Sequence, residues 1–314
     1  MGLKAKKPSK NTPKKDGDSV QILGVKVNST STSSVLRKIS QRIDGGEKTF
    51  VVTPNPEFLV YAQKHFWFKL ILNKADIAIP DGIGLVWASR FLVLWSPTEI
   101  LLSASDSLAK RCPLLKKLIG ARKVKPHKIW WASHTGQEKV TSRPSVIKEK
   151  ISGADLMEKL CALAAKKGWS VYLLGGAPGV ALKSLTALKN RYPGLNGWVE
   201  TGPKLETGNW KLETAEKWVE KINEKKPTFL FIAFGMGKQE KFIYDNWDKL
   251  NVKLAMGVGG AFDYLSGQIP RAPKWIQKLG FEWLYRLIRQ PRRWRRQLSL
   301  LEFIWLVIKE KFSS

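Results

Sequence analysis

The chain has 314 residues, of which 43% are apolar and 11% aromatic, so it can bury one sizeable α/β core and is not a disordered protein. Its 54 Lys and Arg outnumber 26 Asp and Glu, and the resulting net charge of +28 favours an anionic partner such as nucleic acid or acidic lipid. Two cysteines and three histidines without metal-ligand spacing exclude a disulfide framework and predict no metal site.

Residues 1–19 are basic and have almost nothing to bury. They contain six lysines among Pro, Ser, Asn and Gly, so we expect a disordered basic tail. No apolar run follows these lysines, so no secretory signal is expected. The longest apolar stretch, Leu298–Ile308, is far shorter than the roughly 20 residues that span a bilayer. The expected compartment is the reducing cytoplasm, and any membrane contact is expected to be peripheral.

From residue 20 onward, short β-branched runs alternate with amphipathic segments, which is typical of β/α units around a largely parallel sheet. Ser152 and Gly168 fit the two cap positions of one helix, and Pro178 suits the start of another at 180–191. This order predicts an α/β fold with a doubly wound, Rossmann-like sheet. The expected strands are Gln21–Val27, Thr49–Thr53, Ile77–Ile79, Ser170–Leu174, Thr228–Phe234 and Lys253–Val258.

Two segments break this alternation. Residues 93–150 carry many Lys and Arg together with Trp130 and Trp131, and their poor periodicity predicts an inserted basic segment of unknown role. After Gly267 the chain becomes helical and cationic. The predicted organisation is a tail at 1–19, a catalytic domain formed by 20–92 and 151–267, an insertion at 93–150, and a membrane-associating helical appendage at 268–314.

The arginines of the appendage are spaced three and four residues apart, which places them on one face of a helix. Pro291 should kink or restart that helix. Aromatic and aliphatic residues between the cations suit a helix at a membrane interface, although core packing is the ordinary alternative. The arginines concerned are Arg286, Arg289, Arg293 and Arg296.

Polar side chains follow two predicted strands at the carboxyl edge of the sheet, where open α/β folds bind ligands. Thr53 and Asn55 follow one strand, and Asp81 follows the next. An ionised aspartate can accept a proton from an incoming hydroxyl group. Helix capping is the alternative role for Asn55, and from position alone it is the favoured role for Asp81.

Three glycine turns lie between strands and helices, at Gly175–Gly176, at 235–237 and at 257–260. Backbone amides at such a helix N-terminus can approach a diphosphate. Gln239 and Asp263 follow the second and third turns and are available for polar contacts. None of the turns is a dinucleotide fingerprint, but three at successive strand ends favour a phosphate-bearing ligand.

Together these segments resemble the WecG/TagA/CpsF glycosyltransferase family. The matching strings lie within 20–91 and 151–297, in the segments 53–59, 75–90, 152–156, 171–181, 234–243 and 257–296. The resemblance implies a GT-E type Rossmann-like fold and inverting, metal-independent transfer without a cofactor. The donor would be UDP-N-acetylmannosamine or its uronic acid, and the acceptor an undecaprenyl-diphosphate-linked amino sugar for a cell-wall polymer or polysaccharide.

The resemblance also assigns roles to the residues above, with Asp81 as the general base. Arginines and backbone amides would stabilise the leaving diphosphate in the absence of a metal. The expected catalytic residues are Asp81 and Thr53, and the expected substrate-binding residues are Asn55, Gly175, Gly176, Gln239, Gly259, Asp263, Arg286, Arg293 and Arg296.

The expected partners are the UDP-sugar, the polyprenyl-diphosphate acceptor and the anionic inner face of the cell membrane. Attraction to acidic headgroups is an alternative role for the arginines. Two other functions stay open: a basic nucleic-acid-binding protein, although no recognition motif supports a specific nucleic acid, and a non-catalytic envelope scaffold of the same fold.

Overall fold

The structure is a computed structural model, which describes residues 19–94, 146–202, 212–291 and 294–313. Six parallel strands form its central sheet in the order β4-β3-β8-β7-β5-β6. The predicted α/β class with a largely parallel sheet is therefore confirmed, and the arrangement is compatible with a Rossmann-like domain. The strands are β3 (Thr49–Val52), β4 (Ile77–Ala78), β5 (Ser170–Gly175), β6 (Asn196–Glu200), β7 (Phe229–Ala233) and β8 (Leu254–Gly257).

The first strand differs from its prediction. The expected single strand Gln21–Val27 is an antiparallel hairpin of β1 (Ser19–Ile22) and β2 (Val25–Asn28). Leu23 and Gly24 form its two-residue turn with φ of 52° and 70°. Positive φ at both turn residues matches the twist of a tight hairpin, which the apolar pattern alone did not reveal. Strand β6 was also missed, because its residues are only partly buried and lack an apolar run.

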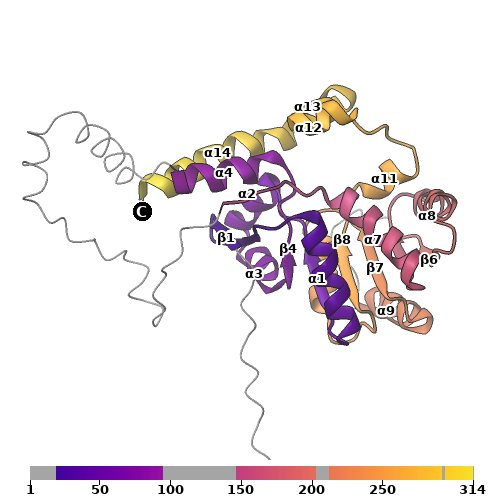
Figure 1. Cartoon of the computed structure of the whole chain (residues 1–314). Coiled ribbons are helices and arrows are strands. Elements are labelled where there is room, and N and C mark those ends of the chain that lie inside the picture. The colour runs from indigo at the N-terminus through magenta and orange to yellow at the C-terminus, as the bar shows by residue number, and fades with distance from the viewer. Residues whose placement is uncertain (1–18, 95–145, 203–211, 292–293, 314) are drawn as a thin grey trace, which may run out of the picture.

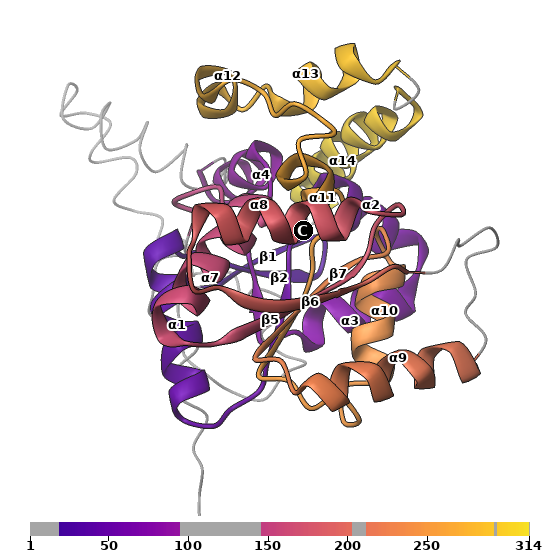
Figure 2. The same cartoon turned by 90° about the vertical axis from the view of Figure 1, so that its right-hand side faces the viewer.

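Helices cover both faces of the sheet, as Figure 2 shows, with α1 and α7 on one side and α3, α9 and α10 on the other. The predicted helix at 180–191 is confirmed with the same bounds. The helices are α1 (Thr32–Asp44), α2 (Pro56–Lys64), α3 (Phe66–Lys74), α4 (Ile83–Leu94), α7 (Gly153–Lys167), α8 (Val180–Arg191), α9 (Leu212–Lys225), α10 (Lys238–Asp245), α11 (Ala261–Leu265), α12 (Lys274–Leu279), α13 (Glu282–Arg289) and α14 (Trp294–Ser313).

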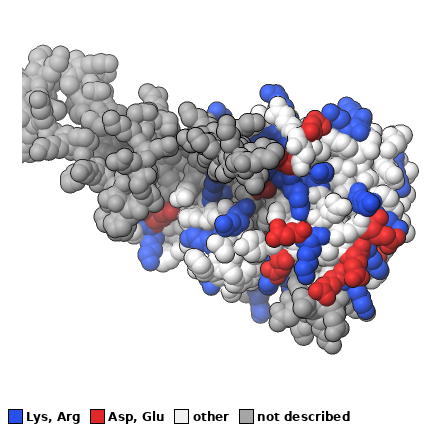
Figure 3. Space-filling view, turned by 90° about the horizontal axis from the view of Figure 1, so that it is seen from below, with Lys and Arg blue, Asp and Glu red and all other residues white. Residues whose placement is uncertain are grey.

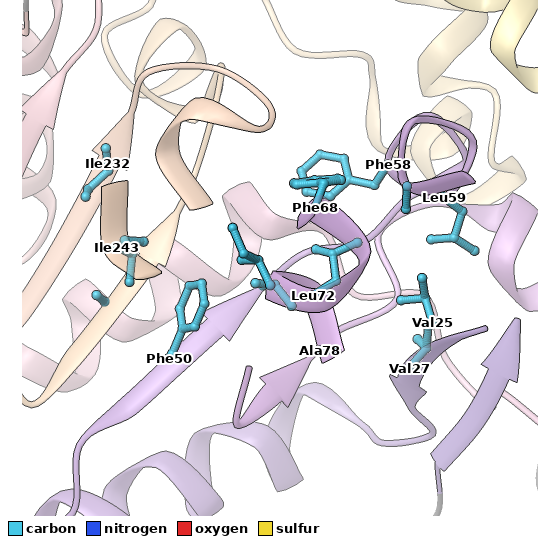
Figure 4. Packing of buried hydrophobic residues seen from close by; sticks show 14 of the residues in the cluster. Val25, Val27, Phe50, Phe58, Leu59, Phe68, Leu72, Ala78, Ile232 and Ile243 are labelled. Atoms are coloured by element: carbon cyan, nitrogen blue, oxygen red, sulfur yellow. The ribbon is translucent and has the colours of Figure 1, made fainter. Parts of the chain in front are cut away.

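The sheet separates two hydrophobic clusters. In β3, Phe50 and Val52 join one cluster while Val51 joins the other. Strands buried on both faces read as continuous apolar runs, which is why the sequence revealed them. Figure 4 shows part of the first cluster, where Phe50 lies among side chains of α3 and α10. This rigid sheet fixes the loops that follow its strands.

The C-terminal helices lie against the domain. Pro291 separates α13 from α14, as expected of a residue that restarts a helix. Helix α14 runs beside α4 and packs on α2 (Figure 1). Its Phe303 and Val307 are fully buried in the first hydrophobic cluster. Part of the predicted appendage therefore completes the core, and Lys64 of α2 pairs with Glu302 of α14 at 2.8 Å.

The predicted insertion at 93–150 is described only at its ends. Helix α4 continues to Leu94, and Ile147 is fully buried in the first cluster. Trp130, Trp131 and the predicted tail, apart from Ser19 in β1, lie outside the described residues. Within the described ranges, no helix is both long and apolar enough to cross a bilayer.

Candidate active site

Two adjoining cavities open at the carboxyl ends of the parallel strands. The larger measures about 560 Å³ and is lined by residues that follow β3, β5, β7 and β8. The smaller, of about 240 Å³, lies between the first turns of α2 and α4 and the helices α13 and α14. Asp81, Glu282 and Arg286 line both cavities, so two ligands could meet there.

Most of the predicted site residues come together in the larger cavity. Its lining includes Thr53, Asn55, Asp81, Gly176, Gln239, Gly259, Asp263, Arg286 and Arg296. Gly175 is not among the lining residues: a Cβ there would lie 2.8 Å from the backbone oxygen of Ala233. Its φ of 101° also favours glycine, so this residue allows the tight turn after β5. Arg293 lies outside the described residues.

Asp81 is held in place by its own backbone and by the start of α7. Its N–H donates to the backbone oxygen of Pro54 at 2.9 Å, and its carboxylate accepts from the N–H of Gly153. Burial raises the pKa of Asp81 to about 6, and the negative charge of Glu282 raises it further. The hydrogen bond from Gly153 and the positive charges of Lys150 and Arg286 lower the pKa and offset part of this rise. The carboxylate is thus ionised at neutral pH and is a stronger base than an exposed aspartate.

Thr53 and Asn55 approach the same junction from the loop after β3. Thr53 is 7% exposed and packs against Gly153, where a Cβ would lie 3.2 Å from Thr53 Cγ2. Asn55 caps α2, because its Oδ1 accepts from the N–H of Phe58 at 2.9 Å. The capping alternative for Asn55 is confirmed, and the residue lines both cavities as well.

Arg286 and Arg296, the two predicted substrate-binding arginines that the structure describes, lie on different helices. The expectation that they share one helical face is therefore wrong. Arg286 lies on α13, and its guanidinium is 4.8 Å from the ring of Tyr264. Its buried Nε has no hydrogen-bond partner among the residues that the structure describes. Arg296 lies on α14 and donates through Nε to Glu57 Oε1 at 2.6 Å. Pro291 breaks the helix between them, yet both side chains reach both cavities.

Sequence reasoning missed the charged residues around Asp81. Glu282 accepts from Arg271 Nε at 3.2 Å, and Arg271 also pairs with Asp155 at the start of α7. Lys150 lines the smaller cavity and donates to the backbone oxygen of Gln277 at 2.6 Å. These residues resemble ordinary surface charges in the sequence, because only the folded chain brings segment 150–155 to α13.

No group of three or more His, Cys, Asp or Glu among the described residues could hold a metal ion. Positive groups near the cavities include Arg286 and Arg296 and the backbone N–H groups at helix N-termini, which can meet an anionic ligand. Glycine turns, a buried carboxylate and two arginines around joined cavities are typical of enzymes that transfer a group from an anionic donor.

The comparison with protein families specifies this class as a glycosyltransferase. The model described as "Glycosyl transferase WecG/TagA/CpsF family" matches residues 20–118 and 140–314. The chain therefore belongs to the WecG/TagA/CpsF family of glycosyltransferases, as the sequence motifs indicated. The unmatched residues 119–139 fall inside the predicted insertion.

The chain is also similar to the N-acetylglucosaminyldiphosphoundecaprenol N-acetyl-beta-D-mannosaminyltransferase of Bacillus spizizenii. The two are 29% identical over 290 residues, which cover 92% of this chain and 90% of that protein. The name of the relative gives its acceptor as a sugar on diphosphoundecaprenol and its transferred group as N-acetylmannosamine.

Proposed function

We propose that this enzyme transfers an N-acetylmannosamine-type sugar from UDP to an undecaprenyl-diphosphate-linked amino sugar, with inversion and without a metal. The observation that carries the proposal is the position of Asp81 at the junction of two cavities. The name of the Bacillus spizizenii relative supports the acceptor and the transferred sugar. The polymer would be a cell-envelope polysaccharide or a teichoic-acid-like chain. In this proposal the fold is of the GT-E type.

The two cavities suit two different substrates. The larger has the glycine turns after β5, β7 and β8, whose N–H groups can meet a diphosphate, so we assign it to the UDP-sugar. The smaller opens between α4 and the C-terminal helices, with apolar Ile83 and Leu300 in its wall. We assign it to the acceptor, because its lipid tail must leave toward a membrane.

The proposed reaction is a single displacement. An acceptor hydroxyl oxygen attacks the anomeric carbon as the bond from that carbon to UDP breaks, and the hydroxyl proton passes to Asp81. UDP leaves from the opposite face of the sugar, which inverts the anomeric centre. The leaving diphosphate gains charge, which Arg286, Arg296 and the backbone N–H groups stabilise.

A panel of UDP-sugars tests the proposed function. We expect UDP release only when an N-acetylmannosamine-type donor and a short-chain lipid-diphosphate amino sugar are both present. EDTA should leave the rate unchanged, because arginines take the place of a metal in the proposed mechanism. Loss of activity in EDTA and its recovery with manganese would contradict metal independence.

The C-terminal helices carry the proposed membrane contact. Figure 1 shows α12, α13 and α14 together along one side of the molecule. Their exposed apolar side chains include Trp275, Ile288, Leu301 and Phe312, each at least 64% exposed. Lys309 lies over the ring of Trp305, which places a cation beside this apolar surface. Such a surface suits an anionic lipid interface and supports a peripheral position on the inner face of the membrane.

Polar substitution should release the protein from membranes without unfolding it. Deletion of the appendage would open the core around Phe303 and Val307, so substitutions at its surface are the better test. Trp275→Ser combined with Ile288→Ser should weaken binding to anionic vesicles by about tenfold or more, since two large apolar groups no longer enter the interface. Leu182→Ser on α8, where the side chain is 57% exposed, is the control and should bind vesicles normally. Equal vesicle binding by all variants would contradict the contact.

The pH profile of kcat/KM should follow the ionisation of Asp81, whose pKa burial raises to about 6. Asp81 takes a proton only when ionised, so the rate should rise with pH through this value. Glu282→Gln removes a negative charge that raises the pKa of Asp81. The acid limb of the kcat/KM profile of this variant should therefore lie at lower pH than that of the wild type. Glu216→Gln, at an exposed carboxylate paired with Lys249, is the control. An unmoved limb in Glu282→Gln would disprove the coupling.

A nucleic-acid-binding function receives less support. On the face seen in Figure 3, the described Lys and Arg side chains are interspersed with Asp and Glu instead of forming one basic patch. The family match and the organised cavities also favour catalysis over a non-catalytic scaffold.

A further inference from the structure

A buried carboxyl group lies beside the larger cavity and takes no part in the proposed reaction. Glu240 in the first turn of α10 is 1% exposed. Its Oε2 accepts from the N–H of Gly237 at 2.7 Å, and its Oε1 accepts from Nε2 of Gln239 at 2.7 Å. Both oxygens thus face N–H donors, as a buried carboxylate requires.

Gln239 extends this connection to a second loop. It is 2% exposed, and its Oε1 accepts from the N–H of Gly259 at 3.0 Å. A Cβ at Gly257 would lie 2.6 Å from Gln239 Nε2, so that position has no room for a side chain. The bond from Gly259 joins the loop after β8 to the loop after β7, and the two bonds to Glu240 hold Gln239 and Gly237 on the β7 side. Both loops line the larger cavity.

The partners fix the orientation of the Gln239 amide. The N–H of Gly259 requires the amide oxygen, and an ionised Glu240, which offers only acceptors, requires the amide nitrogen. That nitrogen carries two hydrogens, and Glu240 takes one of them. Gln239 lines the larger cavity, so an acceptor bound there can take the second hydrogen.

We propose that Glu240 is a positioning residue for the nucleotide donor, which it serves by orienting the Gln239 amide and by holding the two glycine loops together. The assignment rests on the proposed function, because it places UDP in the larger cavity. Gln239 then donates to an oxygen of the nucleotide, and Glu240 acts through Gln239 without touching the donor.

Glu240→Gln tests the positioning role, because an amide of the same shape cannot accept at both ends. Calorimetry with UDP at about pH 8 keeps Glu240 ionised, since burial raises its pKa to about 7. We expect UDP to bind at least about tenfold more weakly, which corresponds to one lost hydrogen bond, and the melting temperature to fall. Asn246→Ala is the matched control, because Asn246 is buried at the far end of α10 and donates to the backbone oxygen of Phe242. This control should have a lower melting temperature than the wild type but bind UDP with normal affinity.

The double variant Gln239→Glu with Glu240→Gln reverses the middle hydrogen bond. The new amide at 240 accepts from Gly237 and donates to the new carboxylate at 239, which also accepts from Gly259. All three hydrogen bonds are restored, so the melting temperature should recover. UDP should still bind weakly, because a carboxylate replaces the N–H that faced the nucleotide.

Each outcome decides the assignment. Normal UDP binding by Glu240→Gln overturns the assignment. A double variant whose melting temperature is no higher than that of Glu240→Gln also overturns it. If Glu240→Gln does not fold, the double variant alone decides: a folded protein with recovered melting supports the hydrogen-bond chain, and an unfolded one overturns it. A wild-type protein that does not bind UDP overturns the proposed function and the donor role together, whereas normal UDP binding by both wild type and Glu240→Gln overturns the Glu240 assignment alone.

Discussion

Asp81→Asn should lower kcat by about 10²- to 10⁴-fold while UDP binds with nearly normal affinity. The amide keeps the shape of the side chain but cannot take the proton of the acceptor hydroxyl, and a general base contributes a factor of this size. The hydrogen bond from Gly153 can remain, because the amide oxygen also accepts. The measurements are single-turnover transfer and calorimetry with UDP.

Asp76→Asn is a matched control for Asp81→Asn. Asp76 precedes β4 and accepts from the N–H of Phe50 and from Arg42. Asp81 follows the carboxyl end of the same strand, so the two aspartates lie at opposite ends of β4. Its replacement should lower the melting temperature but preserve turnover. Wild-type turnover in Asp81→Asn would remove this residue from the mechanism.

Arg286→Ala should lower kcat by about 10²- to 10³-fold, as expected when a group that stabilises the leaving diphosphate is lost. Arg286 lines the larger cavity, and within the described part of the chain its buried Nε has no hydrogen-bond partner, so the guanidinium is not committed to a protein acceptor there. Arg296→Ala should have a smaller effect, because this guanidinium is half exposed and pairs with Glu57. A water-soluble acceptor analogue removes any contribution from membrane binding.

Arg289→Ala is the control for these variants. Arg289 ends the same helix as Arg286, but its guanidinium lies 5.6 Å from the ring of Tyr285 and it does not line either cavity. It should transfer sugar at the wild-type rate. If Arg286→Ala and Arg296→Ala did the same, both arginines would be membrane anchors and the account of the leaving group would be wrong.

The sequence predicted the parts of the fold that depend on local pattern. Strands buried on both faces, such as β7, are continuous apolar runs, and α8 begins after Pro178 as expected. The hairpin of β1 and β2 was missed because it depends on the backbone conformation of Leu23 and Gly24. Strand β6 was missed because a half-buried edge strand has a weak apolar signal.

The site was predictable where its residues directly follow strands. Thr53, Asp81 and Gly259 reach one cavity because the carboxyl ends of parallel strands share an edge. Arg286 was expected at the site, but the other charges that act on Asp81 were not predictable, since Glu282 and Lys150 reach the cavities only in the folded chain. The bonds of Glu240 were hidden for the same reason: its link to Gly259 through Gln239 joins two loops of the folded sheet.

The most direct test of the central claim is mass spectrometry of a short-chain lipid-diphosphate N-acetylglucosamine incubated with the enzyme and UDP-N-acetylmannosamine. The account predicts an acceptor heavier by one N-acetylhexosamine unit, with one UDP released for each unit added and almost no product from Asp81→Asn. An acceptor of unchanged mass, or a product formed equally well by Asp81→Asn, would contradict it.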